Sequence, residues 1–134
     1  MRKSINVLMC VVAAAFLTSC GKPSAEDLAE QTMVKMEEVA SILEGVEDVD
    51  TAKAAAEKIK GITGEIAEIQ KAADEIKGSD EEAKKFEAEM MKKYEDRTKK
   101  MTEKITKSMM GLATKPEAMK IIGDAMAEMS KAAQ

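Results

Sequence analysis

The stretch AKAAAEKIKGITGEIAEIQKAADEI, residues 52–76, has the most regular pattern in the chain. Alanine and isoleucine recur in it at alternating steps of three and four residues, and we call these positions the seam: Ala52, Ala55, Ile59, Ile62, Ile66, Ile69, Ala73 and Ile76. This spacing puts them on one side of an α-helix and is typical of a coiled-coil seam. Gly61 and Gly64 fall off the seam, on the expected outer face. The stretch predicts a long helix that packs against other helices along its whole length.

A second long helix is predicted before this one, over residues 25–45. Ser24 is suited to cap it, and acidic residues follow in its first turn. Asp50 is expected to cap the seam helix by accepting a bond from an unpaired backbone N–H. The short connection favours antiparallel neighbours. The apolar stripe of this helix comprises Leu28, Thr32, Met36, Val39, Leu43 and Val46.

Two more helices are predicted after the seam helix. Gly78 is expected to end the seam helix, and a capping box at Ser79 to open a helix that runs to about Leu112. Acid–base pairs four residues apart, such as Glu89 and Lys93, indicate its solvated face. Pro116 marks the first turn of a shorter last helix. Each of these helices has an apolar stripe. The stripe of the longer helix comprises Ala83, Phe86, Met90, Tyr94, Thr98, Met101, Ile105, Met109 and Leu112. The stripe of the last helix comprises Ala118, Ile122, Ala125, Met129 and Ala132, with Ile121 and Met126 beside it.

The fold class that follows is all-α. No segment alternates with period 2, and no Asn-Gly or Asp-Gly hairpin turn occurs. We expect an elongated antiparallel bundle, resembling a coiled coil, with three long helices and one shorter C-terminal helix. Residues 24–134 would form this single domain.

Composition argues against several classes of function. The chain has 134 residues, no histidine and a formal net charge of −4, and its basic residues are interleaved with acids. The missing histidine excludes the commonest general base and the serine–histidine triad. We therefore expect no enzyme, no catalytic residues, no cofactor and no metal site. The acidic balance also gives no reason to expect nucleic-acid binding, which needs clustered Lys and Arg.

The N-terminal residues have the layout of an export signal. Arg2 and Lys3 precede an apolar run of about 11 residues from Val7 to Leu17, whereas a membrane span needs roughly 20. A signal peptide therefore fits better than the alternative, a short transmembrane anchor. Cys10 would leave with that peptide.

The sequence Leu17-Thr18-Ser19-Cys20 at its end resembles the lipobox of bacterial lipoproteins. The resemblance implies cleavage between Ser19 and Cys20, removal of residues 1–19, and a diacylglycerol thioether on Cys20. The new N-terminus would be acylated, with palmitate as an expected fatty acid, and residues 20–23 would tether the domain to the membrane. In many Gram-negative bacteria Gly21, directly after the lipidated cysteine, implies sorting to the outer membrane, on the side facing the periplasm.

Beyond the lipobox, the chain is only generically similar to small helical envelope lipoproteins such as the murein lipoprotein. That family ends in a lysine that is joined to peptidoglycan. This chain ends Lys131-Ala-Ala-Gln134, so the cross-linking role is not carried over.

Two functional hypotheses remain. The first is a lipid-anchored envelope protein that acts by structural or protein–protein interaction, including self-association through helical faces. The alternative uses methionine, because thioether sulfur binds Cu(I) and reacts with oxidants. Adjacent methionines cannot both be central in one seam, so one of each pair should lie at the edge of the core. The methionines after Cys20 are Met33, Met36, Met90, Met91, Met101, Met109, Met110, Met119, Met126 and Met129.

Overall fold

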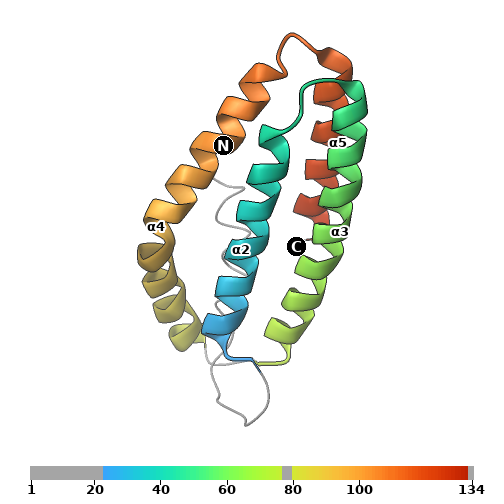
Figure 1. The fold of residues 1–134 in the computed structure, drawn as a ribbon. Helices are drawn as coiled ribbons and strands as arrows, with labels where there is room; N and C mark the ends of the chain where they lie inside the picture. Colours follow the sequence, from blue (N-terminus) through green and yellow to red (C-terminus); the bar gives the residue numbers. More distant parts are fainter. Residues whose placement is uncertain (1–22, 77–79, 133–134) are drawn as a thin grey trace.

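The computed structural model describes residues 23–76 and 80–132, without the side chain of Asp80. These ranges contain the helices α2 (Ala25–Glu44), α3 (Val49–Asp74), α4 (Asp80–Gly111) and α5 (Pro116–Ala132), and no strand. The helices run alternately up and down, and α5 ends well short of the lower end of α3 (Figure 1). The predicted all-α bundle of three long helices and one shorter one is confirmed.

Small side chains decide which helices lie closest. The interface of α3 with α5 is the most extensive, and α2 packs against both α3 and α4. Ala52 and Ala55 of α3, and Ala118 and Ala125 of α5, are all buried in one core. Residues this small let two helix backbones approach closely, as the alanines at the start of the seam predict.

All four described helices contribute to the largest core cluster, here called the upper core because it lies toward the upper end in Figure 1. Ile59, Ile66 and Ile122 are completely buried within it. Its buried members are Met36, Val39, Ala40, Leu43, Val46, Ala52, Ala55, Ala56, Ile59, Ile62, Ile66, Met101, Leu112, Ala118, Ile122, Ala125 and Met129.

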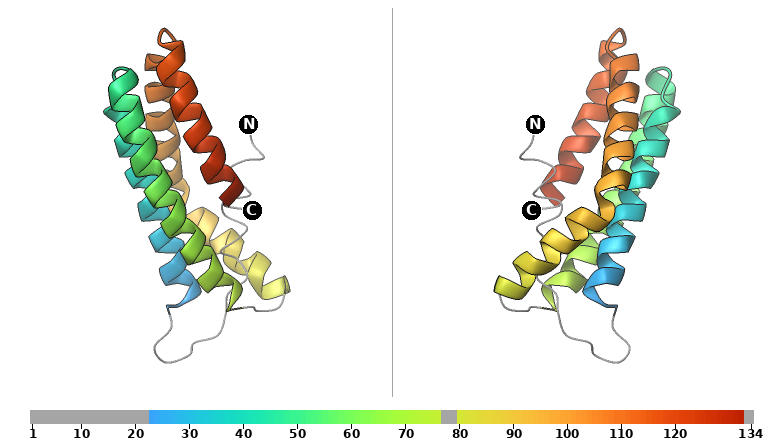
Figure 2. Two further views of the ribbon diagram at one scale, coloured as in Figure 1. Left: turned by 90° about the vertical axis from the view of Figure 1, so that its right-hand side faces the viewer. Right: turned by 90° about the vertical axis from the view of Figure 1, so that its left-hand side faces the viewer.

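Below the upper core, the bundle divides into two smaller clusters. The α2–α4 cluster contains Ala25, Ala29, Met33, Phe86, Met90 and Tyr94. The α2–α3 cluster contains Leu28, Ile69 and Ala73. Figure 2 shows that the N-terminal part of α4 turns away from the direction of its C-terminal part. This part of α4 therefore depends on α2 for its apolar contacts.

Capping boxes begin both α2 and α3. At the start of α2, Ser24 and Asp27 form a capping box, with the Asp27 N–H donating to Ser24 Oγ at 3.1 Å. The prediction that Asp50 caps α3 is wrong, because Asp48 does so. Its carboxylate accepts from the Thr51 N–H at 2.8 Å, and the Thr51 hydroxyl accepts from the Asp48 N–H at 2.9 Å. The helix therefore begins earlier, with Asp50 in its first turn.

The lower end of α3 also differs from expectation. The helix ends at Asp74, with Glu75 as its C-cap residue, and not at Gly78. The Ile76 N–H donates to the Ala73 carbonyl at 3.1 Å, a tighter pattern that closes the last turn. Ile76 lies outside the helix, half-buried against both lower clusters. The predicted capping box at Ser79 falls outside the described residues.

Candidate functional site: the groove between α2 and α3

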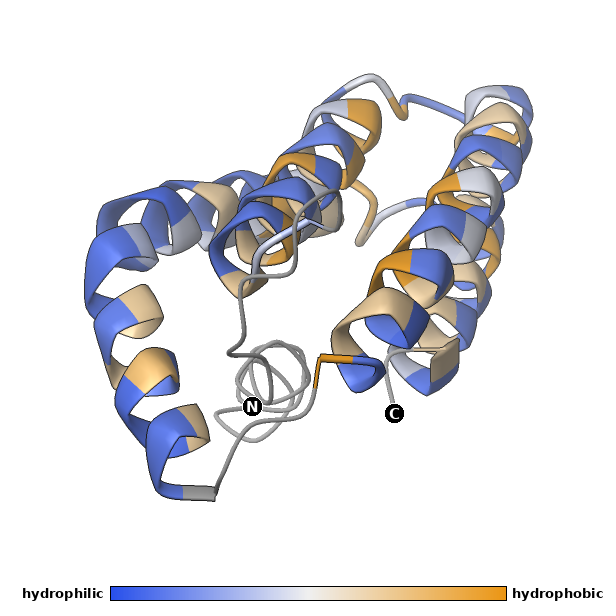
Figure 3. Cartoon of the chain, turned by 90° about the horizontal axis from the view of Figure 1, so that it is seen from below, coloured by the Kyte–Doolittle hydropathy of each residue, from blue (hydrophilic) through white to orange (hydrophobic). Residues whose placement is uncertain are grey.

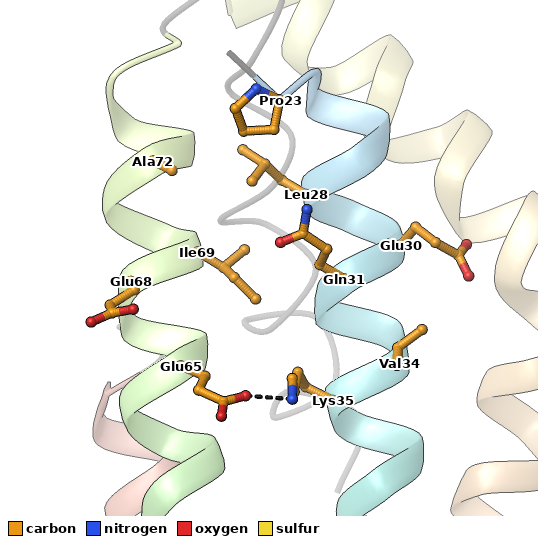
Figure 4. Close-up of a pocket in the computed structure, with 10 residues that line it drawn as sticks. All are labelled: Pro23, Leu28, Glu30, Gln31, Val34, Lys35, Glu65, Glu68, Ile69 and Ala72. Atoms are coloured by element: carbon orange, nitrogen blue, oxygen red, sulfur yellow. Dashed lines mark ion pairs between the residues drawn. The ribbon is translucent and has the colours of Figure 1, made fainter. Parts of the chain in front are cut away.

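A groove of about 450 Å³ lies between the lower halves of α2 and α3. Figure 4 shows the facing side chains, with Leu28 and Gln31 on α2 and Ile69 and Ala72 on α3. Pro23, where the described chain begins, lies at one end of the groove. The residues that line it are Pro23, Leu28, Glu30, Gln31, Val34, Lys35, Glu65, Glu68, Ile69 and Ala72.

The floor of the groove is apolar. Leu28 and Ile69 are buried and belong to the α2–α3 cluster, and Ala72 packs against that cluster while partly exposed. Helix α3 contributes its buried seam residue Ile69 to this floor. Such a floor can bind an apolar group without any chemical step.

An ion pair closes the other end of the groove. Lys35 of α2 and Glu65 of α3 reach across it, as Figure 4 shows, and Lys35 also contacts Glu38 at 3.2 Å. The hydrogen bond to Glu65, with that to Glu38 second, raises the pKa of Lys35 above its usual value. Glu68 adds a carboxylate on the α3 edge. The groove therefore has a polar, bridged end and an apolar end at Pro23.

A second polar feature joins α2 to α4, here called the Arg97 clasp. The Arg97 guanidinium donates from Nε and Nη2 to both oxygens of Glu37, each at 2.8 Å, and from Nη1 to Glu30 at 2.7 Å. These bonds hold the pKa values of Glu30 and Glu37 below their usual range and raise the pKa of Arg97. Lys93 pairs with Glu26 of α2, and not with Glu89 on its own helix as predicted.

Tyr94 lies buried beside the clasp. Its ring has the Lys93 ammonium and the Arg97 guanidinium each 5.4 Å from its centre, a cation–π arrangement. Burial, with the nearby Glu30 carboxylate second, raises the pKa of the Tyr94 hydroxyl. Among the described residues that hydroxyl has no hydrogen bond of good geometry. The arrangement packs α4 onto α2.

The methionines occupy the core and its edges. Met33, Met36, Met90, Met101 and Met129 are buried, and Met109 and Met126 are partly buried against the upper core. Met91, Met110 and Met119 are exposed, Met110 by 72%. The prediction that one member of each adjacent pair lies at the edge is confirmed at Met91 and Met110.

Ser19 and Cys20, the predicted cleavage and lipidation residues, lie outside the described residues, so their roles stay predictions. Over the two described ranges no helix has the length and apolar character needed to cross a membrane. The same ranges hold no group of three or more His, Cys, Asp or Glu residues arranged for a metal ion.

Sequence reasoning missed both the groove and the clasp. Arg97 carried a signal, because apart from Arg2 it is the only arginine in a chain whose other bases are lysines. A planar guanidinium can bind two carboxylates at once, which an ammonium cannot do with the same geometry. The groove had no such signal, since Leu28 and Ile69 are ordinary seam residues.

No protein-family model, curated protein or solved structure matches this chain. Function is therefore inferred from the residues of the chain itself.

Proposed function

We propose that this protein is a lipid-anchored helical protein of the bacterial cell envelope that acts by structural or protein–protein interaction, without catalysis of its own. The lipobox-like Leu17-Thr18-Ser19-Cys20 supports an anchor at Cys20 in the outer membrane, with the bundle in the periplasm. The observation that carries the proposal is that α2 begins at Ala25 with Ser24 as its cap, so only Gly21, Lys22 and Pro23 separate Cys20 from the bundle. Three residues of tether reach about 10 Å at most.

The arrangement of the helices supports a spacing or presenting role. The start of α2, the end of α3 and the start of α4 lie at one end of the bundle, and both turns lie at the other (Figure 1). Lys115 of the α4–α5 turn donates to the Glu47 carbonyl of the α2–α3 turn, which joins the two turns. The 26 residues of α3 span about 39 Å. A bundle anchored at its lower end would therefore carry a braced tip about 40 Å away.

The interior supports binding over chemistry. Within the described ranges, the buried side chains are apolar apart from Thr32 and the Tyr94 hydroxyl. Thr32 donates to the carbonyl of Leu28, one turn earlier in its own helix, at 2.9 Å. These groups offer little for acid–base catalysis, which needs a titratable side chain at an accessible cleft.

The anchor is tested by replacing Cys20 with Ala in cells fed labelled palmitate. We expect the variant to lose the label, to keep its leader and to leave the outer-membrane fraction. Cys10→Ala is the matched control, because that thiol lies within the leader and should not affect labelling. Label that still enters the Cys20→Ala protein would contradict the proposal.

One observation favours the alternative, a methionine-based Cu(I) or oxidant buffer. Met36, Met101, Met126 and Met129 share the upper core and come from three helices. Counted from the upper turns at 1.5 Å per residue, all four lie roughly 12–20 Å down the bundle. Thioether sulfurs gathered in one core are the soft ligands that Cu(I) prefers. Titration of the protein against a Cu(I) chelator under reducing conditions separates the hypotheses, and failure to compete would end the copper hypothesis.

A further inference from the structure

The groove between α2 and α3 has a direction. The Lys35–Glu65 ion pair bridges one end, and Pro23 lies at the other (Figure 4). From Leu28 to Lys35 the floor extends seven residues, or about 10 Å of helix. The groove is thus open toward the end at which the tether joins the bundle.

We propose that, when the protein is out of the bilayer, one acyl chain carried by Cys20 lies in this groove. The inference rests on the proposed lipidation. Cys20 precedes Pro23 by three residues, so its sulfur stays within roughly 10 Å of the open end. A ligand held so close has a high effective concentration at the groove, which favours it over free competitors.

The shape and chemistry of the groove suit an acyl chain. A fatty acyl chain spans half of the hydrocarbon core, about 15 Å, so the floor covers most of one chain. The floor consists of Leu28, Ile69 and Ala72, with Pro23 at the mouth, and the charged pair lies where the chain would stop. A peptide would leave its backbone N–H and C=O groups without partners on this floor, whereas an acyl chain has none to satisfy.

The bilayer remains the preferred place for the anchor. The groove covers part of one chain, whereas the bilayer buries the whole length of every chain on Cys20. The groove would therefore be vacated in the membrane and filled in water. This makes it a holding site that hides apolar surface while the protein is between membranes.

A photoreactive fatty acid tests the proposal in the protein as cells make it. Cells are fed a diazirine analogue of palmitate, and the purified mature protein is irradiated either in phospholipid vesicles or after transfer to detergent-free buffer. The intact mass shows whether acyl chains are attached. We expect cross-links to peptides containing Leu28, Ile69 or Ala72 in buffer, and to lipid in vesicles.

Two variants and a control make the test specific. Ala72→Trp fills part of the groove. If the acyl chain then buries about two methylenes fewer there, its affinity for the groove falls about tenfold, and the cross-links to the groove peptides should fall by the same factor. Gln31→Glu, at an exposed position, adds a charge to the wall and should act in the same direction. Ala54→Trp, on the exposed face of α3, should change nothing.

The outcomes are distinguishable. An intact mass without acyl chains would refute the proposed function, and the groove proposal with it. Acyl chains that are present but cross-link elsewhere, or cross-links that both groove variants leave unchanged, would refute the groove proposal alone.

Discussion

The upper core and the α2–α4 cluster hold the described helices together in different ways. In the upper core, residues from four helices bury one another, and Ile59, Ile66 and Ile122 have no exposed surface. In the α2–α4 cluster, Phe86 and Tyr94 of α4 pack on alanines and one methionine of α2. The charged bonds of the Arg97 clasp then add to these contacts.

This difference predicts where the bundle opens first. A segment with few apolar partners and solvent-facing ion pairs has a lower free energy of local opening than a shared core. Figure 3, seen from the lower end, shows the start of α4 lying apart from the α3–α5 pair, with many hydrophilic residues along its ribbon. We therefore expect residues 80–97 to open while α3 and α5 stay folded.

The largest effect is expected from a charge in the upper core. Ile66→Asp places a carboxylate at a fully buried position without a partner, which should cost about 4 kcal/mol and unfold the domain. Gly64→Asp is the matched control, because a side chain there meets open space. Thermal unfolding followed by far-UV circular dichroism checks this, and equal melting of the two variants would contradict the seam assignment.

The fold was predictable because its signals are local and repeated. Seven of the eight seam residues of α3 are buried within the helix, from Ala52 to Ala73. The eighth, Ile76, fails because the helix stops at Asp74, and no seam pattern records where a helix stops. The prediction that Asp50 caps α3 was wrong for the same reason, because the sequence does not fix the residue at which a helix begins. Thr51 completes a capping box with Asp48, three residues before it, and only the backbone geometry selects between the two aspartates.

A smaller and more local effect is expected in the α2–α4 cluster. Phe86→Ala removes a buried aromatic side chain from the start of α4, and should cost about 3 kcal/mol. Hydrogen exchange measured by mass spectrometry should show residues 80–97 losing protection while α3 keeps it. Met91→Ala, on the exposed side of the same helix, should leave the pattern unchanged. Uniform loss of protection through α3 and α5 would mean that the two regions open together.

The Arg97 clasp gives a moderate, pH-dependent effect. Arg97→Met keeps the stem but removes the bonds to Glu30 and Glu37, which should cost about 1 kcal/mol at neutral pH because the pair is partly exposed.

The pKa values of both carboxyls lie below the usual 4.5 in the folded protein. The two carboxylates therefore contribute to the free energy of unfolding above pH 4.5, and this contribution is lost as the pH falls through the lowered pKa values. In urea titrations, the stability of the unsubstituted protein and that of Arg97→Met should converge as the pH falls through these lowered pKa values. Arg97→Lys keeps the charge but not the planar guanidinium that binds both carboxylates, so its stability should lie between those of the other two proteins. A difference in stability that persists at low pH would contradict the Arg97 clasp.

The candidate site could not be predicted because it depends on partners distant in sequence. Arg97 lies 67 residues from Glu30 and 60 from Glu37 in the sequence, and local spacing instead favoured pairs within α4. The groove lies between α2 and α3 over the buried Leu28 and Ile69, and its presence is a property of helix placement. The lipobox-like motif, by contrast, is contiguous, so an anchor at Cys20 can be proposed from the sequence alone; it stays a prediction, because Cys20 lies outside the described residues.

Small effects are expected from methionine substitutions, and they sharpen the comparison of the two regions. Replacing Met90, Met109 or Met126 with Leu nearly conserves volume and apolarity, so each should cost less than roughly 1.5 kcal/mol. Met90 shares its cluster with Phe86 and Tyr94, and a thioether beside aromatic rings gains contacts that Leu lacks. Met109 and Met126, at the edge of the aliphatic upper core, have no such neighbours within that cluster. Urea unfolding should therefore rank Met90→Leu as the most costly of the three. Equal costs at all three positions would show that the aromatic residues of the α2–α4 cluster add nothing beyond their apolar area.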